Sequence, residues 1–217
     1  LAVGTIESYL VYRLTGGRAH VSDASNASRT ALMAIGSGDW DDGLLSLFGV
    51  PRSILPEICD SAGQLGMTDA SLFGAPIAIT GMAGDQQAAL IGQSCLEPGQ
   101  TKATFGTGAF VLTQTGRTLP KSTNRLLATV AWQLGGERHY ALEGSVFVAG
   151  SLIQWLRDDL GLIDASPDTE PLARSVEDNG GVYLVPALSG LGAPHWQPHA
   201  RAAIHGVQLF HHVSSWS

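Results

Sequence analysis

A short apolar run that leads directly into a helix is the feature that most constrains the fold of this chain. Residues 76–81 are nearly all apolar, which is typical of a buried strand, and residues 85–93 read as a helix that leaves it. Further on, the sequence predicts a helix at 146–160, after a meander of strands at 101–105, 110–114, 127–134 and 139–142. Helices and strands therefore alternate along the chain.

The first fifty residues carry clear helix start and stop signals. Residues 5–17 form an amphipathic pattern with the Gly16-Gly17 pair at its end, so we expect a helix with a glycine C-cap. A connection rich in Ser, Asn and Asp follows at 20–30. A second helix is predicted at 41–48, where Gly49-Val50-Pro51 ends it.

Composition excludes several classes of protein. Hydrophobic residues make up 44% of the 217 residues, enough for a sizeable core, and a net charge of -7 argues against a nucleic-acid surface. No apolar run approaches the length of a membrane span. Cys59 and Cys95 form no metal or disulfide pattern, which favours the cytoplasm, and His195 and His199 are separated by a proline. We therefore predict no metal ligands in this chain.

Two short motifs carry the chemistry. Asp85 stands where the predicted strand passes into its helix, and Gly106-Thr107-Gly108 forms a turn between two predicted strands. Taken singly, the Asp is often only an N-cap and the turn only a hairpin. As a pair, a carboxylate and a turn whose N–H groups and hydroxyl could face a phosphate indicate phosphoryl transfer. The sequence has no Walker-type phosphate loop in this stretch.

Several ordered blocks of sequence carry a family resemblance. The blocks are Gly-Asp-Gln-Gln-Ala-Ala-Leu at 84–90, Phe-Gly-Thr-Gly-Ala-Phe at 105–110, and further blocks at 23–30, 143–150, 153–158 and 185–194. From residue 4 to about 206 the chain resembles the FGGY carbohydrate-kinase family, and within it the members that phosphorylate glycerol rather than pentuloses. The resemblance implies an actin-like, ribonuclease H-like ATPase fold of two α/β domains with the active site between them. Residues 1–93 would end the first domain and residues 94–206 begin the second, and we cannot align the tail at 207–217.

The resemblance also implies roles for the substrate side of the reaction. Asp85 would be the general base that takes a proton from the terminal hydroxyl of glycerol, giving sn-glycerol 3-phosphate. Gln86 would hold a glycerol hydroxyl, and Phe110 would pack against the carbon chain. Two plainer interpretations stay open, in which Gln86 is an exposed helix residue and Phe110 a core aromatic.

On the nucleotide side, the resemblance implies ATP with Mg²⁺. Thr107 would contact the phosphates, and Gly106 and Gly108 would let the backbone come close. Gly150 and Gln154 would line the nucleotide cleft, although Gly150 could equally be a small residue that lets a helix pack closely. The intact enzyme is expected to be a cytoplasmic homo-oligomer.

Parts of the family pattern are not found in these 217 residues. The upstream phosphate hairpin with its magnesium-linked Asp, the residues that grip glycerol and the adenine-contacting region are all missing. We therefore expect a middle part of a kinase that is inactive alone. Two other functions stay open: a kinase for another polyol or sugar such as erythritol or xylulose, and a non-catalytic nucleotide-binding scaffold with the actin-like fold. Asp85 counts against the scaffold, which needs no base.

Overall fold

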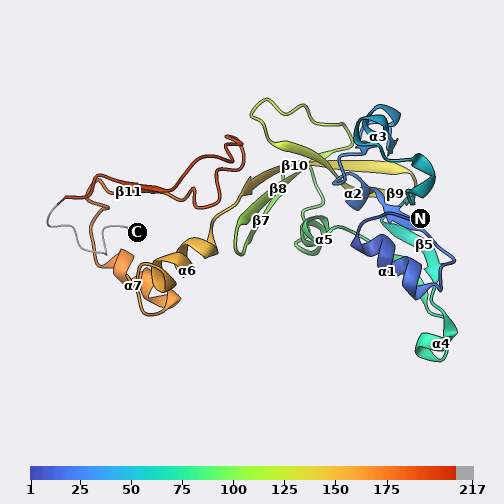
Figure 1. The fold of residues 1–217 in the computed structure, drawn as a ribbon, viewed down its shortest axis with the longest axis horizontal. Coiled ribbons are helices and arrows are strands. Elements are labelled where there is room, and N and C mark those ends of the chain that lie inside the picture. Colours follow the sequence, from blue (N-terminus) through green and yellow to red (C-terminus); the bar gives the residue numbers. More distant parts are fainter. Residues whose placement is uncertain (209–217) are drawn as a thin grey trace. The chain divides into compact units, whose positions relative to one another are not determined.

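The computed structural model describes residues 1–208 and divides into two compact units (Figure 1). Unit 1 comprises Leu1–Lys102, Leu112–Thr123 and Leu127–Glu143. Unit 2 comprises Ala103–Val111, Asn124–Leu126 and the residues from Gly144 on. The predicted unaligned tail lies, from residue 209 on, outside the described residues.

Helices are short in both units. They are α1 (Ile6–Leu14), α2 (Ala24–Ala27), α3 (Asp42–Phe48), α4 (Ala70–Phe73), α5 (Asp85–Gly92), α6 (Gly150–Asp158) and α7 (Thr169–Arg174), with 3₁₀ turns η1 (Arg52–Ile54) and η2 (Ser166–Asp168). The predicted helices α1, α3 and α5 are confirmed. Gly16 after α1 and Gly49 after α3 have φ of 63° and 66°, the left-handed conformation that ends a helix.

The strands form one four-stranded sheet and several pairs. The sheet has the order β7 (Thr101–Phe105), β8 (Ala109–Gly116), β10 (Glu137–Val146), β9 (Leu127–Leu134). The two-stranded pairs are β1 (Val21–Asp23) with β4 (Glu57–Cys59), β2 (Met33–Ala34) with β3 (Asp39–Trp40), β5 (Ala62–Met67) with β6 (Ala78–Gly81), and β11 (Tyr183–Val185) with β12 (Ala203–His205). The β1–β4 pair is parallel, and the other three pairs are antiparallel.

The predicted meander is wrong in its order. All four strands of the sheet exist, but β8 lies beside β10 rather than beside β9. The connection from β8 to β9, residues 117–126, is far longer than a hairpin turn, so the two strands need not be neighbours. The two-residue link between β9 and β10 does make a hairpin, with Leu134 opposite Glu137.

Three other predictions need correction. The strand at 76–81 exists as β6, but most of its residues are exposed because it pairs only with β5 in a two-stranded sheet. The connection at 20–30 contains β1 and α2. The helix predicted from residue 146 begins at Gly150, because β10 continues to Val146.

The core of unit 1 is built around α2. Buried apolar side chains from α2, the β2–β3 hairpin, α3 and the β9–β10 hairpin form one cluster: Ala24, Ala27, Met33, Trp40, Leu45, Val130 and Tyr140. The indole N–H of Trp40 donates to the Pro56 carbonyl at 2.9 Å, which satisfies its polar end. In unit 2 the buried apolar side chains are Ala109, Val148, Ile163, Val182 and Ala187.

A buried carboxylate organises the start of α2. Asp23, which is 0% exposed, is the N-cap of α2 and accepts hydrogen bonds from the Ser25 and Asn26 N–H groups at 3.1 and 3.2 Å. It also accepts from the Asn26 side-chain amide at 2.7 Å and from the Ser61 hydroxyl at 2.7 Å. One side chain therefore ties the helix to the segment that leads into β5.

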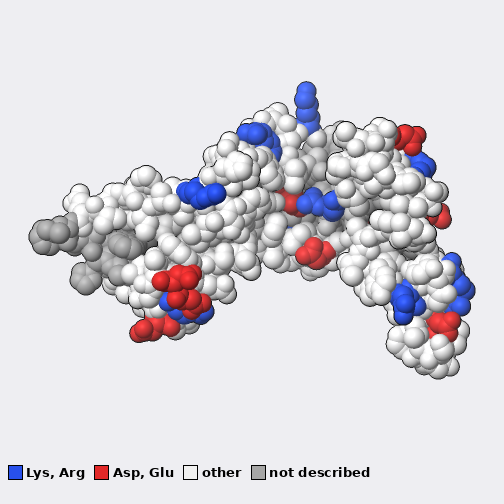
Figure 2. All heavy atoms as spheres, viewed as in Figure 1, with Lys and Arg blue, Asp and Glu red and all other residues white. Residues whose placement is uncertain are grey.

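Charged side chains on the face drawn in Figure 2 lie mostly beside charges of the opposite sign. Ion pairs of this kind join Arg52 to Asp39 at 3.0 Å and Arg157 to Asp158 at 2.6 Å. Exposed pairs contribute little to stability. Across the described residues, no helix has the length and apolarity that a bilayer crossing requires.

We predict that Asp23→Ala lowers the free energy of unfolding by about 2 to 4 kcal/mol, since it removes a cap and leaves the buried Ser61 hydroxyl without its acceptor. Asp69→Ala is the matched control: Asp69 caps α4 through the Ser71 N–H at 3.0 Å and is much more exposed. Its loss should cost about 1 kcal/mol. Urea unfolding followed by circular dichroism measures both, and equal costs would contradict the role given to Asp23.

Candidate active site

Asp85 is an exposed carboxylate at the first position of α5. Gly84 is the N-cap, and the Asp85 carboxylate accepts hydrogen bonds from the Gln86 N–H at 2.8 Å and from the Gln86 side-chain amide at 3.2 Å. It thus satisfies one free N–H of the helix, but from inside the helix rather than from the N-cap position that the plainer interpretation assumed. Both carboxylate oxygens have a fixed donor, and the group still faces solvent.

Buried polar contacts hold the start of α5 in place. The Gly84 N–H donates to the Ser25 hydroxyl of α2 at 2.9 Å. A Cβ on Gly84 would lie 2.5 Å from Oε1 of Gln87, so a larger residue would have to displace that buried amide. Gln87 is buried and donates from Nε2 to the Thr129 hydroxyl and the Val130 carbonyl, both at 3.3 Å. The backbone that carries Asp85 is therefore fixed by α2 and β9.

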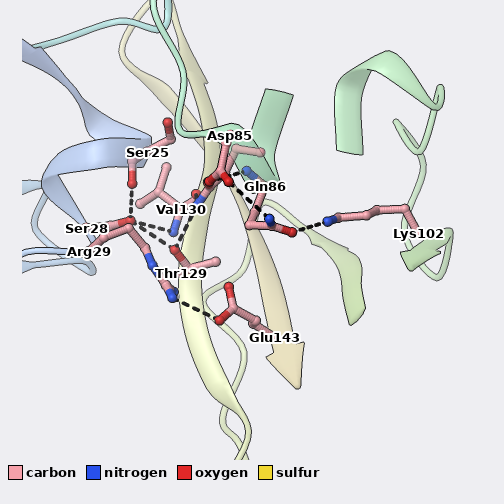
Figure 3. Close-up of polar contacts among 10 residues, drawn as sticks. Ser25, Ser28, Arg29, Asp85, Gln86, Lys102, Thr129, Val130 and Glu143 are labelled. Carbon is pink, nitrogen blue, oxygen red and sulfur yellow. Dashed lines mark hydrogen bonds and ion pairs between the residues drawn. The ribbon is translucent and has the colours of Figure 1, made fainter. Parts of the chain in front are cut away.

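Gln86 lies between Asp85 and a lysine that the sequence analysis missed. Figure 3 shows Lys102, on β7, reaching Oε1 of Gln86, while Nε2 of the same amide donates to Asp85. Only 2% of the Lys102 surface is exposed. Burial lowers the pKa of Lys102, and the charges of Asp85 and Glu143 act against that shift. The sequence feature that could have indicated this residue was a lysine inside a predicted strand, three residues before Phe105.

An ion pair between Arg29 and Glu143 lies in the same region (Figure 3). The guanidinium donates to Oε1 of Glu143 at 2.9 Å, and the side chains are 36% and 2% exposed. Both residues occur in blocks that carried the family resemblance. Because they are 114 residues apart, no spacing in the sequence predicted that they would pair. The charges of Arg29, Glu143, Lys102 and Asp85 alternate in sign, which limits the cost of burying Glu143 and Lys102.

A pocket of about 360 Å³ in unit 2 gathers four of the five predicted nucleotide-binding residues. Its lining consists of Gly106, Thr107, Gly150, Ile153, Gln154, Ser166 and Thr169. Thr107 is exposed at the tip of the turn between β7 and β8. Gln154 follows Gly150 by one helical turn, so both lie on the same face of α6.

Packing explains two of the glycines at this pocket. A Cβ on Gly150 would lie 2.5 Å from the Gly106 carbonyl oxygen, and one on Gly108 would overlap the Val146 carbonyl oxygen. The Gly150 N–H donates to Gly106 at 2.9 Å, and the Ala149 and Ser151 N–H groups donate to the Thr107 carbonyl at 2.8 and 3.2 Å. These first N–H groups of α6 are thus used inside the protein. By contrast, a Cβ on Gly106 would meet only the Gly108 carbonyl oxygen, at 3.9 Å.

Phe110 belongs to unit 2, where it is half-buried on β8, while Asp85 and Gln86 belong to unit 1. Its contact with a substrate stays a prediction, as do the roles given to the other site residues. Among residues 1–208, no group of three or more His, Cys, Asp or Glu side chains could hold a metal ion. Cys59 and Cys95 are both free, and burial raises the pKa of Cys59 to about 12, which makes its thiol a poor nucleophile.

The chain is similar to several known proteins. The chain is 58% identical over 207 residues to a glycerol kinase from Methylobacterium nodulans and to one from Alkalilimnicola ehrlichii, which covers 95% of this chain. It spans only 41% and 42% of their lengths. A Plasmodium falciparum glycerol kinase, solved with ADP, superimposes with a TM-score of 0.89 at 37% identity, over 99% of this chain and 43% of that one.

Two family models cover nearly all of the sequence. The N-terminal domain of the FGGY family of carbohydrate kinases matches residues 2–92, and the C-terminal domain matches residues 101–214. The predicted boundary at 93/94 falls in the interval between the matches and stays a prediction. The predicted actin-like, ribonuclease H-like ATPase fold is confirmed. This chain belongs to the FGGY family of carbohydrate kinases.

Proposed function

We propose that these residues serve the ATP-dependent phosphorylation of glycerol to sn-glycerol 3-phosphate, with Asp85 as the general base. The observation that carries the proposal is an exposed carboxylate whose two oxygens are fixed by Gln86 on a firmly anchored helix. The 58% identity to glycerol kinases supports glycerol as the substrate.

The chemistry requires a base of this kind. A primary alcohol is a poor nucleophile, and a carboxylate within hydrogen-bond reach both orients it and accepts its proton as the new O–P bond forms. The bond between the γ-phosphorus and the β–γ bridging oxygen breaks, so ADP leaves and the carboxylate is left protonated. Gln86 would donate to or accept from a second hydroxyl of glycerol, and Phe110 would pack against its carbon atoms.

The pocket in unit 2 would take the nucleotide. Open space on the Cα of Gly106 lets a phosphate oxygen approach the turn, and the exposed Thr107 can add its hydroxyl. The Gly106 N–H itself already donates to the Gly108 carbonyl at 2.8 Å. The Ala149, Gly150 and Ser151 N–H groups already donate to carbonyls of the turn, so they are not free to bind a phosphate. Gly150 and Gln154 would line the side of the pocket.

Mg²⁺ would arrive with the ATP phosphates. The described residues offer no cluster of carboxylates for it, and magnesium in kinases is typically held by substrate phosphates, water and one or two carboxylates. A cytoplasmic location and a homo-oligomeric enzyme also stay predictions from the sequence.

The proposal can be tested in a hybrid kinase, in which residues 1–206 replace the matching segment of the full-length Methylobacterium nodulans enzyme. We expect the hybrid to phosphorylate glycerol, and Asp85→Asn to lower kcat by about 10²- to 10⁴-fold, the usual worth of a general base. Glycerol binding should persist, because the amide keeps the shape of the carboxylate. ADP formation in a coupled assay gives kcat, and calorimetry gives the glycerol Kd.

Asp42→Asn is the matched control, since Asp42 is likewise an exposed Asp at the first position of a helix. It should leave kcat unchanged. A drop of less than tenfold in Asp85→Asn would overturn the base assignment. A hybrid that prefers erythritol or xylulose would overturn glycerol as the substrate, and one that binds nucleotide without any turnover would favour the scaffold function.

The nucleotide pocket gives a second prediction, from two neighbouring glycines. Gly106→Ala should fold normally and weaken ADP binding by at least about tenfold, because its methyl group occupies the approach to the turn. Gly108→Ala should lower the free energy of unfolding by about 1 to 3 kcal/mol, because its methyl group overlaps the Val146 carbonyl. Calorimetric titration of ADP into the hybrid and thermal unfolding separate the two effects. Unchanged ADP affinity in Gly106→Ala would argue against this pocket.

A further inference from the structure

We propose that Lys102 is a positioning residue that fixes which end of the Gln86 amide faces Asp85. The inference rests on the proposed function, because it concerns the same base. Lys102 lies on β7, whereas Asp85 and Gln86 lie on α5. The hydrogen bond from Lys102 to Gln86 therefore joins two elements (Figure 3).

The hydrogen-bonding capacity of the three groups allows one arrangement. An ammonium group only donates, a carboxylate only accepts, and a carboxamide has one end of each kind. Lys102 donates to Oε1 of Gln86, which leaves the NH₂ end for Oδ2 of Asp85 at 3.2 Å. If the amide turned over, its oxygen would face the carboxylate and its NH₂ group would face the ammonium. Both contacts would then be repulsive.

The cost of burying Lys102 supports a functional role. Lysine is almost never fully buried without partners, and this one is 2% exposed inside a strand. The charged or titratable groups that face it are Asp85 from α5, Glu143 from β10 and Cys95 from the segment after α5. Arg29 binds Glu143 and offsets part of its charge. An apolar side chain would fill the position without a desolvation penalty, so the buried ammonium indicates a role for its polar contacts, of which the hydrogen bond to Gln86 reaches the candidate base.

A purely structural role for Lys102 makes a different prediction. If Lys102 acts only by joining β7 to α5, its removal should harm the enzyme whether or not residue 86 is a glutamine. If it acts through the amide, its removal should matter only while the amide is present. A double-mutant cycle between residues 86 and 102 therefore separates the two roles.

The test uses the hybrid kinase with Lys102→Met, Gln86→Ala and the double variant. We expect Lys102→Met to lower kcat/KM for glycerol by about 10- to 100-fold, since a misplacement of roughly 1 Å near a reacting group can cost about 100-fold. In the Gln86→Ala background the same change should have less than about a threefold effect. Effects that multiply in the double variant, or an unaltered Lys102→Met enzyme, would overturn the inference. Thermal unfolding of each variant shows that folded protein is compared.

Lys121→Met is the matched control, because Lys121 is the only other lysine of the chain and is exposed. It should behave as the unaltered hybrid.

A second readout keeps this inference separate from the proposed function. The side-chain amide of Gln86, assigned in ¹⁵N-glutamine-labelled protein by its loss in Gln86→Ala, should shift in Lys102→Met and not in Lys121→Met. A hybrid that fails to phosphorylate glycerol would refute the proposed function, and the amide signal would still decide the role of Lys102. An amide signal that ignores Lys102→Met would refute the positioning role even in an active enzyme.

Discussion

The position of the candidate base depends on a set of buried polar contacts that begins at Asp23. This carboxylate caps α2 and holds the Ser61 hydroxyl, which places Ser25 where it accepts the Gly84 N–H. Gly84 in turn starts α5, whose first residue is Asp85. Each contact is buried, where an unmade hydrogen bond is costly, so the arrangement has few alternatives. A surface carboxylate thus gains a fixed position from a side chain 62 positions earlier in the sequence.

Local signals in the sequence were enough to predict where several elements begin or end, although most strands of the short pairs and α2, α4 and α7 were not predicted. Gly16 and Gly49 ended α1 and α3 as expected, and β7 and β9 have the predicted bounds. The order of strands could not be predicted in this way, because the link from β8 to β9 permits more than one neighbour. The prediction that β6 is buried was also wrong. An apolar run shows that a strand is suited to burial, but it does not show which element packs over it. The chain spans about 41% of its relatives' length.

In the candidate site too, local motifs could be predicted from the sequence, whereas contacts between distant segments could not. The family blocks pointed to Asp85, Gln86 and the turn at 106–108, all of which are contiguous motifs. They did not point to Lys102 or to the pair formed by Arg29 and Glu143, because those contacts join separate blocks. Which side chains surround a motif depends on the tertiary fold and not on the neighbouring sequence. Sequence reasoning therefore identified the contiguous motifs and missed the contacts between separate blocks.

The glycines of the turn show why a motif alone is weak evidence for a ligand. Gly108 and Gly150 are required by close backbone contacts with Val146 and Gly106, and these contacts exist whether or not a nucleotide binds. Their presence in the sequence therefore cannot distinguish a phosphate-binding turn from a tightly packed one. Gly106 differs, because its Cα faces open space at the pocket and its φ is not positive. No packing or backbone constraint in residues 1–208 demands glycine there, so the case for a nucleotide rests on Gly106 together with the exposed Thr107.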